Sequence, residues 1–185
     1  MKDISELERL ELQRHLEMLY PKLVLDKAIS NMAIEVTRQI ELLNPTVICV
    51  LAGGLFVTAS LVQALNFPLK LGFTQVSRYR GETVGQDIKT VVDISIEGSM
   101  EGEHILLVDD IFDEGVTLEH LVIQCLSMKA ASVRTAVLIK KVHDRKTTSL
   151  QPDFIGLTAP DKFLIGCGMD YKGYFRNLPD IYTIS

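Results

Sequence analysis

Residues Glu103–Leu118, with the sequence EHILLVDDIFDEGVTL, combine a strand, an acidic segment and the start of a helix. The unbroken apolar run Ile105–Val108 is typical of a buried parallel strand. The acidic residues that follow are Asp109, Asp110 and Asp113. A turn containing Gly115 then leads into a helical pattern over Thr117–Met128. α/β proteins hold a phosphate with this order of elements, because backbone N–H groups and the helix dipole favour an anion at a helix N-terminus.

The acidic residues restrict the ligand, because carboxylates beside a phosphate repel it unless a cation lies between them. They are tolerated if they bind another part of the same molecule, such as hydroxyl groups, Mg²⁺ or a proton to be removed. A sugar phosphate with free hydroxyls meets all of these conditions. The stretch therefore predicts a sugar phosphate ligand.

The same stretch resembles the signature for 5-phosphoribosyl 1-diphosphate (PRPP) in type I phosphoribosyltransferases. That signature is an apolar strand, two acids, two apolar residues, an acid, a small or polar residue, Gly, any residue and Thr, and every position is matched here. The resemblance implies the α/β fold of this family, with a central, mostly parallel sheet flanked by helices and a small hood from the N- and C-terminal segments. It implies one domain over residues 1–185, with a core at about 26–157 and a hood from about 1–25 and 158–185.

The composition agrees with one globular domain of 185 residues, of which 47% are apolar and 23% charged. The net charge of −5 argues against a nucleic-acid or anionic-membrane surface. No apolar stretch has transmembrane length, and the charged N-terminus is unlike a signal peptide. The cysteines, Cys49, Cys125 and Cys167, are far apart. We therefore expect reduced thiols in a cytoplasmic protein.

Two amphipathic helices are expected before the first strand. The first covers Ile4–Leu19, is opened by Asp3 or Ser5 and is ended by Pro21. The second covers about Asp26–Leu43.

Apolar strands alternate with helices in the middle of the chain, which predicts a parallel sheet flanked by helices. The strand Thr46–Leu51 is followed by a glycine pair and a helix over Leu55–Leu65. The further strands are expected at Lys70–Ser77, Val91–Ile96, Ser132–Ile139 and Asp153–Leu157. Ligands of such sheets bind at the carboxyl ends of the strands. The ends with polar or glycine residues are Leu51–Gly54, Asp109–Thr117 and Lys140-Lys141.

Some features have plain structural explanations. The glycine pair lets backbone approach a ligand, but a tight turn without a ligand has the same sequence. The polar segment Arg78–Lys89 is either a mobile lid or a solvated hairpin loop. The histidines, His15, His104, His120 and His143, are not spaced as metal ligands, so surface or packing roles are favoured. The chain has no P-loop, no Gly-x-Gly-x-x-Gly and no Asp-x-Asp-x-Thr.

More distant segments resemble the 6-oxopurine branch of the family, the hypoxanthine-guanine phosphoribosyltransferases. The segment Leu51, Ala52, Gly53 and Gly54 resembles the pyrophosphate loop, whose first two residues are joined by a cis peptide bond. Ala52 replaces a residue that is often basic, so the resemblance implies that it binds through its backbone N–H. Arg176, in Tyr-Phe-Arg, resembles the residue that reaches the pyrophosphate. The segment Ser77, Arg78 and Tyr79 resembles the Ser-Tyr of the family's catalytic lid, with Arg78 as an extra residue between the two.

The purine site is implied by three further matches. Phe163 and Leu164 resemble the segment that stacks on the purine and reads its edge. Asp170 resembles the residue near the purine that anchors a second Mg²⁺. Lys140 and Lys141 both match the lysine that reads the base in this family, and counting from Thr117 favours Lys141.

The resemblance implies Mg²⁺-dependent transfer of 5-phosphoribosyl from PRPP to N9 of hypoxanthine or guanine, giving IMP or GMP and pyrophosphate. The 5′-phosphate would lie on Glu114, Gly115, Val116 and Thr117, with the metal ligands Asp109, Asp110 and Asp170. Asp109 and Asp110 would also hold the ribose hydroxyls. Asp113, which also belongs to the PRPP signature, would be the general base at N7. Its alternative role is to cap the following helix.

Two alternatives remain at this stage: a PRPP-binding regulator with the same fold, and a transferase that prefers another base, above all xanthine. The partners expected are small-molecule substrates and further copies of the chain in a homodimer or homotetramer, with no nucleic acid and no membrane.

Overall fold

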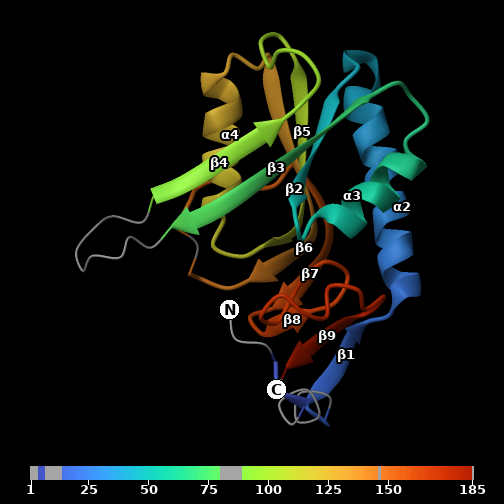
Figure 1. Cartoon of the computed structure of the whole chain (residues 1–185). Helices are drawn as coiled ribbons and strands as arrows, with labels where there is room; N and C mark the ends of the chain where they lie inside the picture. Colours follow the sequence, from blue (N-terminus) through green and yellow to red (C-terminus); the bar gives the residue numbers. More distant parts are fainter. Residues whose placement is uncertain (1–3, 7–13, 80–88, 146, 185) are drawn as a thin grey trace.

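The computed structural model describes residues 4–6, 14–79, 89–145 and 147–184, and its central element is a six-stranded sheet (Figure 1). The strand order is β4-β3-β2-β5-β6-β7, in which only the β3–β4 pair is antiparallel. The strands are β2 (Thr46–Leu51), β3 (Lys70–Tyr79), β4 (Lys89–Ser95), β5 (His104–Phe112), β6 (Ser132–Val142) and β7 (Phe154–Pro160). The predicted α/β fold with a mostly parallel sheet is therefore confirmed.

Helices cover both faces of this sheet (Figure 1). The helices α2 (Lys22–Ile40) and α3 (Leu55–Ala64) pack on one face, and α4 (Val116–Ser127) packs on the other. Neighbouring residues of β5 show the division, because Leu106 packs with α2 and α3 while Leu107 packs with α4. Strands buried on both faces are apolar at consecutive positions, which explains the apolar run Ile105–Val108. Among the described residues, no helix is both long and apolar enough to span a membrane.

A second, three-stranded antiparallel sheet forms at one end of the molecule, at the bottom of Figure 1. Its strands are β1 (Leu16–Tyr20), β9 (Ile181–Ile184) and β8 (Phe163–Ile165). The backbone N–H of Lys22, at the start of α2, donates to Asp180 Oδ1 at 2.7 Å. Segments near the two ends of the chain thus form the small sheet together. The family resemblance predicted a hood from these segments.

The N-terminal predictions were partly wrong. Leu16–Leu19 lies in β1 instead of a helix, because its backbone pairs with β9. Residues 7–13 of that predicted helix lie outside the described residues. Pro21 is the N-cap of α2, so this helix begins before Asp26. It ends at Ile40, and a 3₁₀ helix, η1 (Glu41–Leu43), follows.

Two central strands continue beyond their predicted ends. β5 runs to Phe112 and β6 to Val142, and Asp109 pairs with Val137 in the ladder. The change from apolar to polar side chains marks the point where the strands reach the cavity described below, and backbone pairing continues past it.

Candidate active site

A cavity of about 570 Å³ lies at the carboxyl ends of β2, β5 and β6. Its volume falls in the range of small-molecule sites. The predicted site residues that line it are Leu51, Ala52, Gly53, Asp109, Asp110, Asp113, Glu114, Gly115, Val116, Thr117, Lys141, Phe163, Leu164, Asp170 and Arg176. Gly54 and Lys140 are not among the lining residues.

The turn between β5 and α4 requires glycine. Gly115 is the N-cap of α4 with φ +87°, and a Cβ there would lie 2.3 Å from Thr148 Cγ2. The first N–H groups of a helix have no partner within the helix. Val116 and Thr117 begin α4 and line the cavity, so this end of the cavity suits a phosphate.

Asp109 and Asp110 are buried at the cavity, with exposed fractions of 8% and 7%. Burial raises the pKa of both carboxyls, and the neighbouring charge of Asp110 raises that of Asp109 further. Asp109 Oδ1 accepts the backbone N–H of Asp110 at 2.9 Å. Within the described part of the chain, no salt bridge reaches either carboxylate. Two adjacent buried carboxyls that form no ion pair with a described side chain fit a hard cation such as Mg²⁺.

The pyrophosphate-type loop contacts this acidic pair. The Leu51–Ala52 peptide bond is cis, as the resemblance implies. A Cβ at Gly53 would lie 2.1 Å from Asp110 Oδ2, so the backbone passes directly against the carboxylate. Gly54 has a different role, because a Cβ there would lie 2.6 Å from the Val108 carbonyl oxygen. It allows the start of α3 to approach β5.

The C-terminal segment lines the cavity beside the Leu51–Gly54 loop. A Cβ at Gly168 would lie 2.0 Å from the Gly53 carbonyl oxygen, so the two backbones touch. Arg176 donates to the Gly168 carbonyl and pairs with Asp170 Oδ1 at 2.5 Å. Asp170 and Arg176 therefore reach the cavity as an ion pair.

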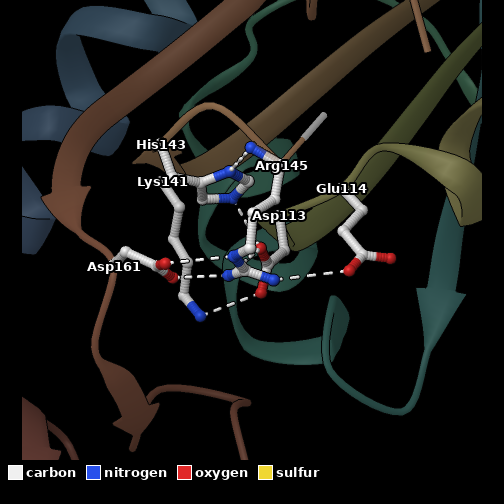
Figure 2. Close-up of polar contacts among 6 residues, drawn as sticks. All are labelled: Asp113, Glu114, Lys141, His143, Arg145 and Asp161. Carbon is white, nitrogen blue, oxygen red and sulfur yellow. Dashed lines mark hydrogen bonds and ion pairs between the residues drawn. The ribbon is translucent and has the colours of Figure 1, made fainter. Parts of the chain in front are cut away.

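Asp113 is the centre of a polar network (Figure 2). Lys141 Nζ donates to Asp113 Oδ2 at 2.8 Å, and His143 Nε2 lies 2.6 Å from Oδ1. Partial burial alone would raise the pKa of Asp113, but the bonds from Lys141 and then His143 outweigh it and the pKa is lowered. The alternative of a helix cap is wrong, because Gly115 is the N-cap and α4 has no side-chain cap.

The structure separates the two candidate lysines. Lys141 is buried and lines the cavity, whereas Lys140 donates to Gln151 Oε1 at 2.8 Å. Adjacent residues of a strand point to opposite faces, so only one of the pair can reach the site.

The purine-type segment and the lid are described to different degrees. Phe163 is 52% exposed, and its ring meets that of Tyr171 edge-on at 6.0 Å. Ser77, Arg78 and Tyr79 lie in β3 opposite β4, but their side chains and residues 80–88 lie outside the described residues. The predicted lid is therefore placed only where β3 enters it.

Sequence reasoning missed His143, Arg145 and Met169. Met169 lines the cavity, and the other two contact Asp113. Period-two alternation could have identified His143, since it follows Lys141 by two positions.

Comparisons with known proteins agree with this geometry. The family model described as "Phosphoribosyl transferase domain" matches residues 15–172. A hypoxanthine-guanine phosphoribosyltransferase of Bacillus subtilis (strain 168) is 35% identical over 158 residues, which are 85% of this chain and 86% of that protein. A hypoxanthine-guanine-xanthine phosphoribosyltransferase of Tritrichomonas foetus is 32% identical over 170 residues, which are 89% and 88% of the two chains. A solved hypoxanthine-guanine-xanthine phosphoribosyltransferase structure has a TM-score of 0.79 at 30% identity and covers 93% of this chain and 99% of its own.

Proposed function

Because the chain belongs to the phosphoribosyltransferase family, we propose that it is a purine-salvage enzyme that transfers 5-phosphoribosyl from PRPP to N9 of hypoxanthine or guanine. The observation that carries this proposal is one cavity that joins a phosphate-binding turn, a buried acidic pair and the Asp113–Lys141 pair. The names of the similar proteins support the same activity.

The PRPP half of the reaction uses the end of the cavity at β5 and α4. The 5′-phosphate binds the N–H groups and hydroxyl of Glu114–Thr117, and Asp109 and Asp110 accept hydrogen bonds from the ribose hydroxyls. The backbone of Leu51–Gly53 and the guanidinium of Arg176 bind the pyrophosphate. Asp109, Asp110 and Asp170 would hold Mg²⁺, which offsets the charge of the leaving pyrophosphate when it is bound.

The purine half uses Lys141, Asp113 and Phe163. Lys141 donates to O6 of the base, Asp113 accepts the proton from N7, and Phe163 stacks on the ring. As the C1′–N9 bond forms, the bond from C1′ to the pyrophosphate oxygen breaks and the N7 proton passes to Asp113. A 6-amino group would set donor against donor at Lys141, which explains a choice of 6-oxopurines over adenine.

Further parts of the proposal extend the family resemblance. Xanthine is a third candidate substrate, since two of the similar proteins carry it in their names. We also propose that Ser77–Tyr79 belongs to a lid and that the core and hood have the boundaries given above. We propose in addition that the protein forms a homodimer or homotetramer and that it resides in the cytoplasm. The three cysteines are free in the structure, in keeping with the last of these.

An assay with PRPP, Mg²⁺ and each of hypoxanthine, guanine, xanthine and adenine tests the proposal. We expect turnover with hypoxanthine or guanine and none with adenine. Absence of turnover with both 6-oxopurines, together with PRPP binding, would instead favour the regulator.

A further inference from the structure

His143 contacts the proposed general base from outside the cavity. Its side chain is 4% exposed, and its Nε2 lies 2.6 Å from Asp113 Oδ1 (Figure 2). Asp113 and Lys141 line the cavity, while His143 is not among the lining residues. A ligand in the cavity would therefore meet Asp113, with His143 behind it.

The protonation of this imidazole follows from its second nitrogen. His143 Nδ1 accepts the backbone N–H of Arg145 at 3.0 Å, so Nδ1 carries no proton. The ring is then the neutral tautomer with its proton on Nε2, and Nε2–H donates to Asp113 Oδ1. Lys141 donates to the other oxygen, Oδ2. The two carboxylate oxygens thus have separate partners.

We propose that His143 is a positioning residue for the transfer reaction, which holds Oδ1 of Asp113 so that Oδ2 faces the purine. This inference rests on the proposed function. When a purine binds, Lys141 turns to O6 and releases Oδ2, and His143 is then the closest remaining partner of Asp113. A carboxylate without that bond could rotate about its side-chain torsions. A neutral donor also orients the base without adding a second full positive charge.

The other charged groups around Asp113 have partners of their own. Arg145 Nη2 is 3.4 Å from Asp113 Oδ1 but only 2.6 Å from Asp161 Oδ1, and Arg145 Nη1 is 3.3 Å from Glu114 Oε1. The guanidinium therefore bonds mainly to Asp161. Ligand atoms of Asp113, His143 and Asp161 lie within 4.8 Å of one another, as around a metal ion. The cations of Lys141 and Arg145 already neutralise this cluster, which makes a metal there unnecessary.

Two substitutions separate the hydrogen bond from packing. His143→Met removes the donor at similar size, and His143→Gln keeps an N–H donor near the position of Nε2. We expect His143→Met to lower kcat/KM for the purine about tenfold, the effect of losing about one hydrogen bond to a charged group. The acidic limb of its pH profile should move to higher pH, because the pKa of Asp113 rises when a donor is lost. His143→Gln should restore most of the lost kcat/KM and most of the wild-type pH profile. The KM for PRPP should be unchanged in both variants.

A double-mutant cycle with Asp113→Asn gives the decisive comparison. His143→Met should have no further effect on the rate in the Asp113→Asn background. An equal fold-loss in both backgrounds would overturn the positioning role. If wild-type protein turned over neither hypoxanthine nor guanine, the proposed function would fail first, and this inference with it.

Nuclear magnetic resonance on wild-type protein labelled with ¹⁵N-histidine covers the case in which His143→Met does not fold. The nitrogen shifts of His143 should report the neutral Nε2–H tautomer at pH 7. A proton on Nδ1 would overturn the proposal.

Discussion

The close approach of Gly53 to Asp110 predicts a substitution that damages the site and spares the fold. A Cβ at Gly53 would lie 2.1 Å from Asp110 Oδ2, about 1.3 Å short of ordinary van der Waals contact near 3.4 Å. The three nearest atoms are all of the Asp110 carboxyl group, which can turn away while the backbone stays in place. Gly53→Ala should therefore displace Asp110, the pyrophosphate loop, or both by about 1 Å.

A displacement of this size has a known kinetic cost. Misplacing reacting groups by about 1 Å can lower a rate about 10²-fold. We expect Gly53→Ala to lower kcat by about that factor in a steady-state assay with PRPP and hypoxanthine. Its melting temperature should stay within about 2 °C of wild type, because no core side chain is displaced.

Gly102→Ala is the matched control, with strain but no contact. Gly102 has φ +81°, and a Cβ there would meet nothing within 4 Å. The left-handed backbone costs alanine about 1 kcal/mol, which lowers the melting temperature of a chain of this size by about 2–4 °C. Its kcat should not change. If Gly53→Ala kept wild-type kcat, the inferred contact between the loop and the acidic pair would be wrong.

Three further predictions concern the purine half of the site. Asp113→Asn should leave PRPP binding intact in a calorimetric titration. It should slow the transfer by about 10²–10⁴-fold, which is the usual contribution of general base catalysis. Loss of PRPP binding would show that Asp113 has a structural role instead. Lys141→Gln should raise the KM for hypoxanthine at least about tenfold, which is the worth of one charged hydrogen bond. Lys140→Gln is the control and should leave this KM unchanged, because the Lys140 side chain bonds to Gln151. Equal effects of the two substitutions would refute the assignment of Lys141 to the base. Since the pKa of Asp113 is lowered, its carboxylate stays ionised below the ordinary aspartate range near 4. At saturating PRPP and Mg²⁺, whose binding to Asp109 and Asp110 favours the ionised form of both carboxyls, kcat/KM for the purine should fall only as pH drops through that lowered value. A fall between pH 5 and 6 under these conditions would contradict the assignment.

The fold was predictable wherever both faces of an element are buried. Ile105–Val108 and Thr46–Leu51 are continuous apolar runs, and both lie in central strands. β1 was not predictable, because its leucines fit a helical pattern and its partner β9 lies at the other end of the chain. The contact between Lys22 and Asp180 spans 158 positions, and no local pattern encodes it.

Most of the residues selected from the sequence line one cavity, but the contacts between them were not predictable. The resemblance selected positions that the structure brings to one cavity, and alternation along β6 separates Lys141 from Lys140. The partners of Asp113 were missed, because His143 is an isolated histidine in the sequence and gains its neighbour only when β5 and β6 pair. Side-chain contacts between strands depend on register, which the sequence does not display.

The stoichiometry of the reaction tests the central claim most directly. Purified protein with PRPP, Mg²⁺ and hypoxanthine should form IMP and pyrophosphate in equal amounts, resolved by chromatography and mass spectrometry. Equal amounts would require that both halves of the cavity act on one PRPP molecule. Pyrophosphate without IMP, or no consumption of PRPP, would contradict the account.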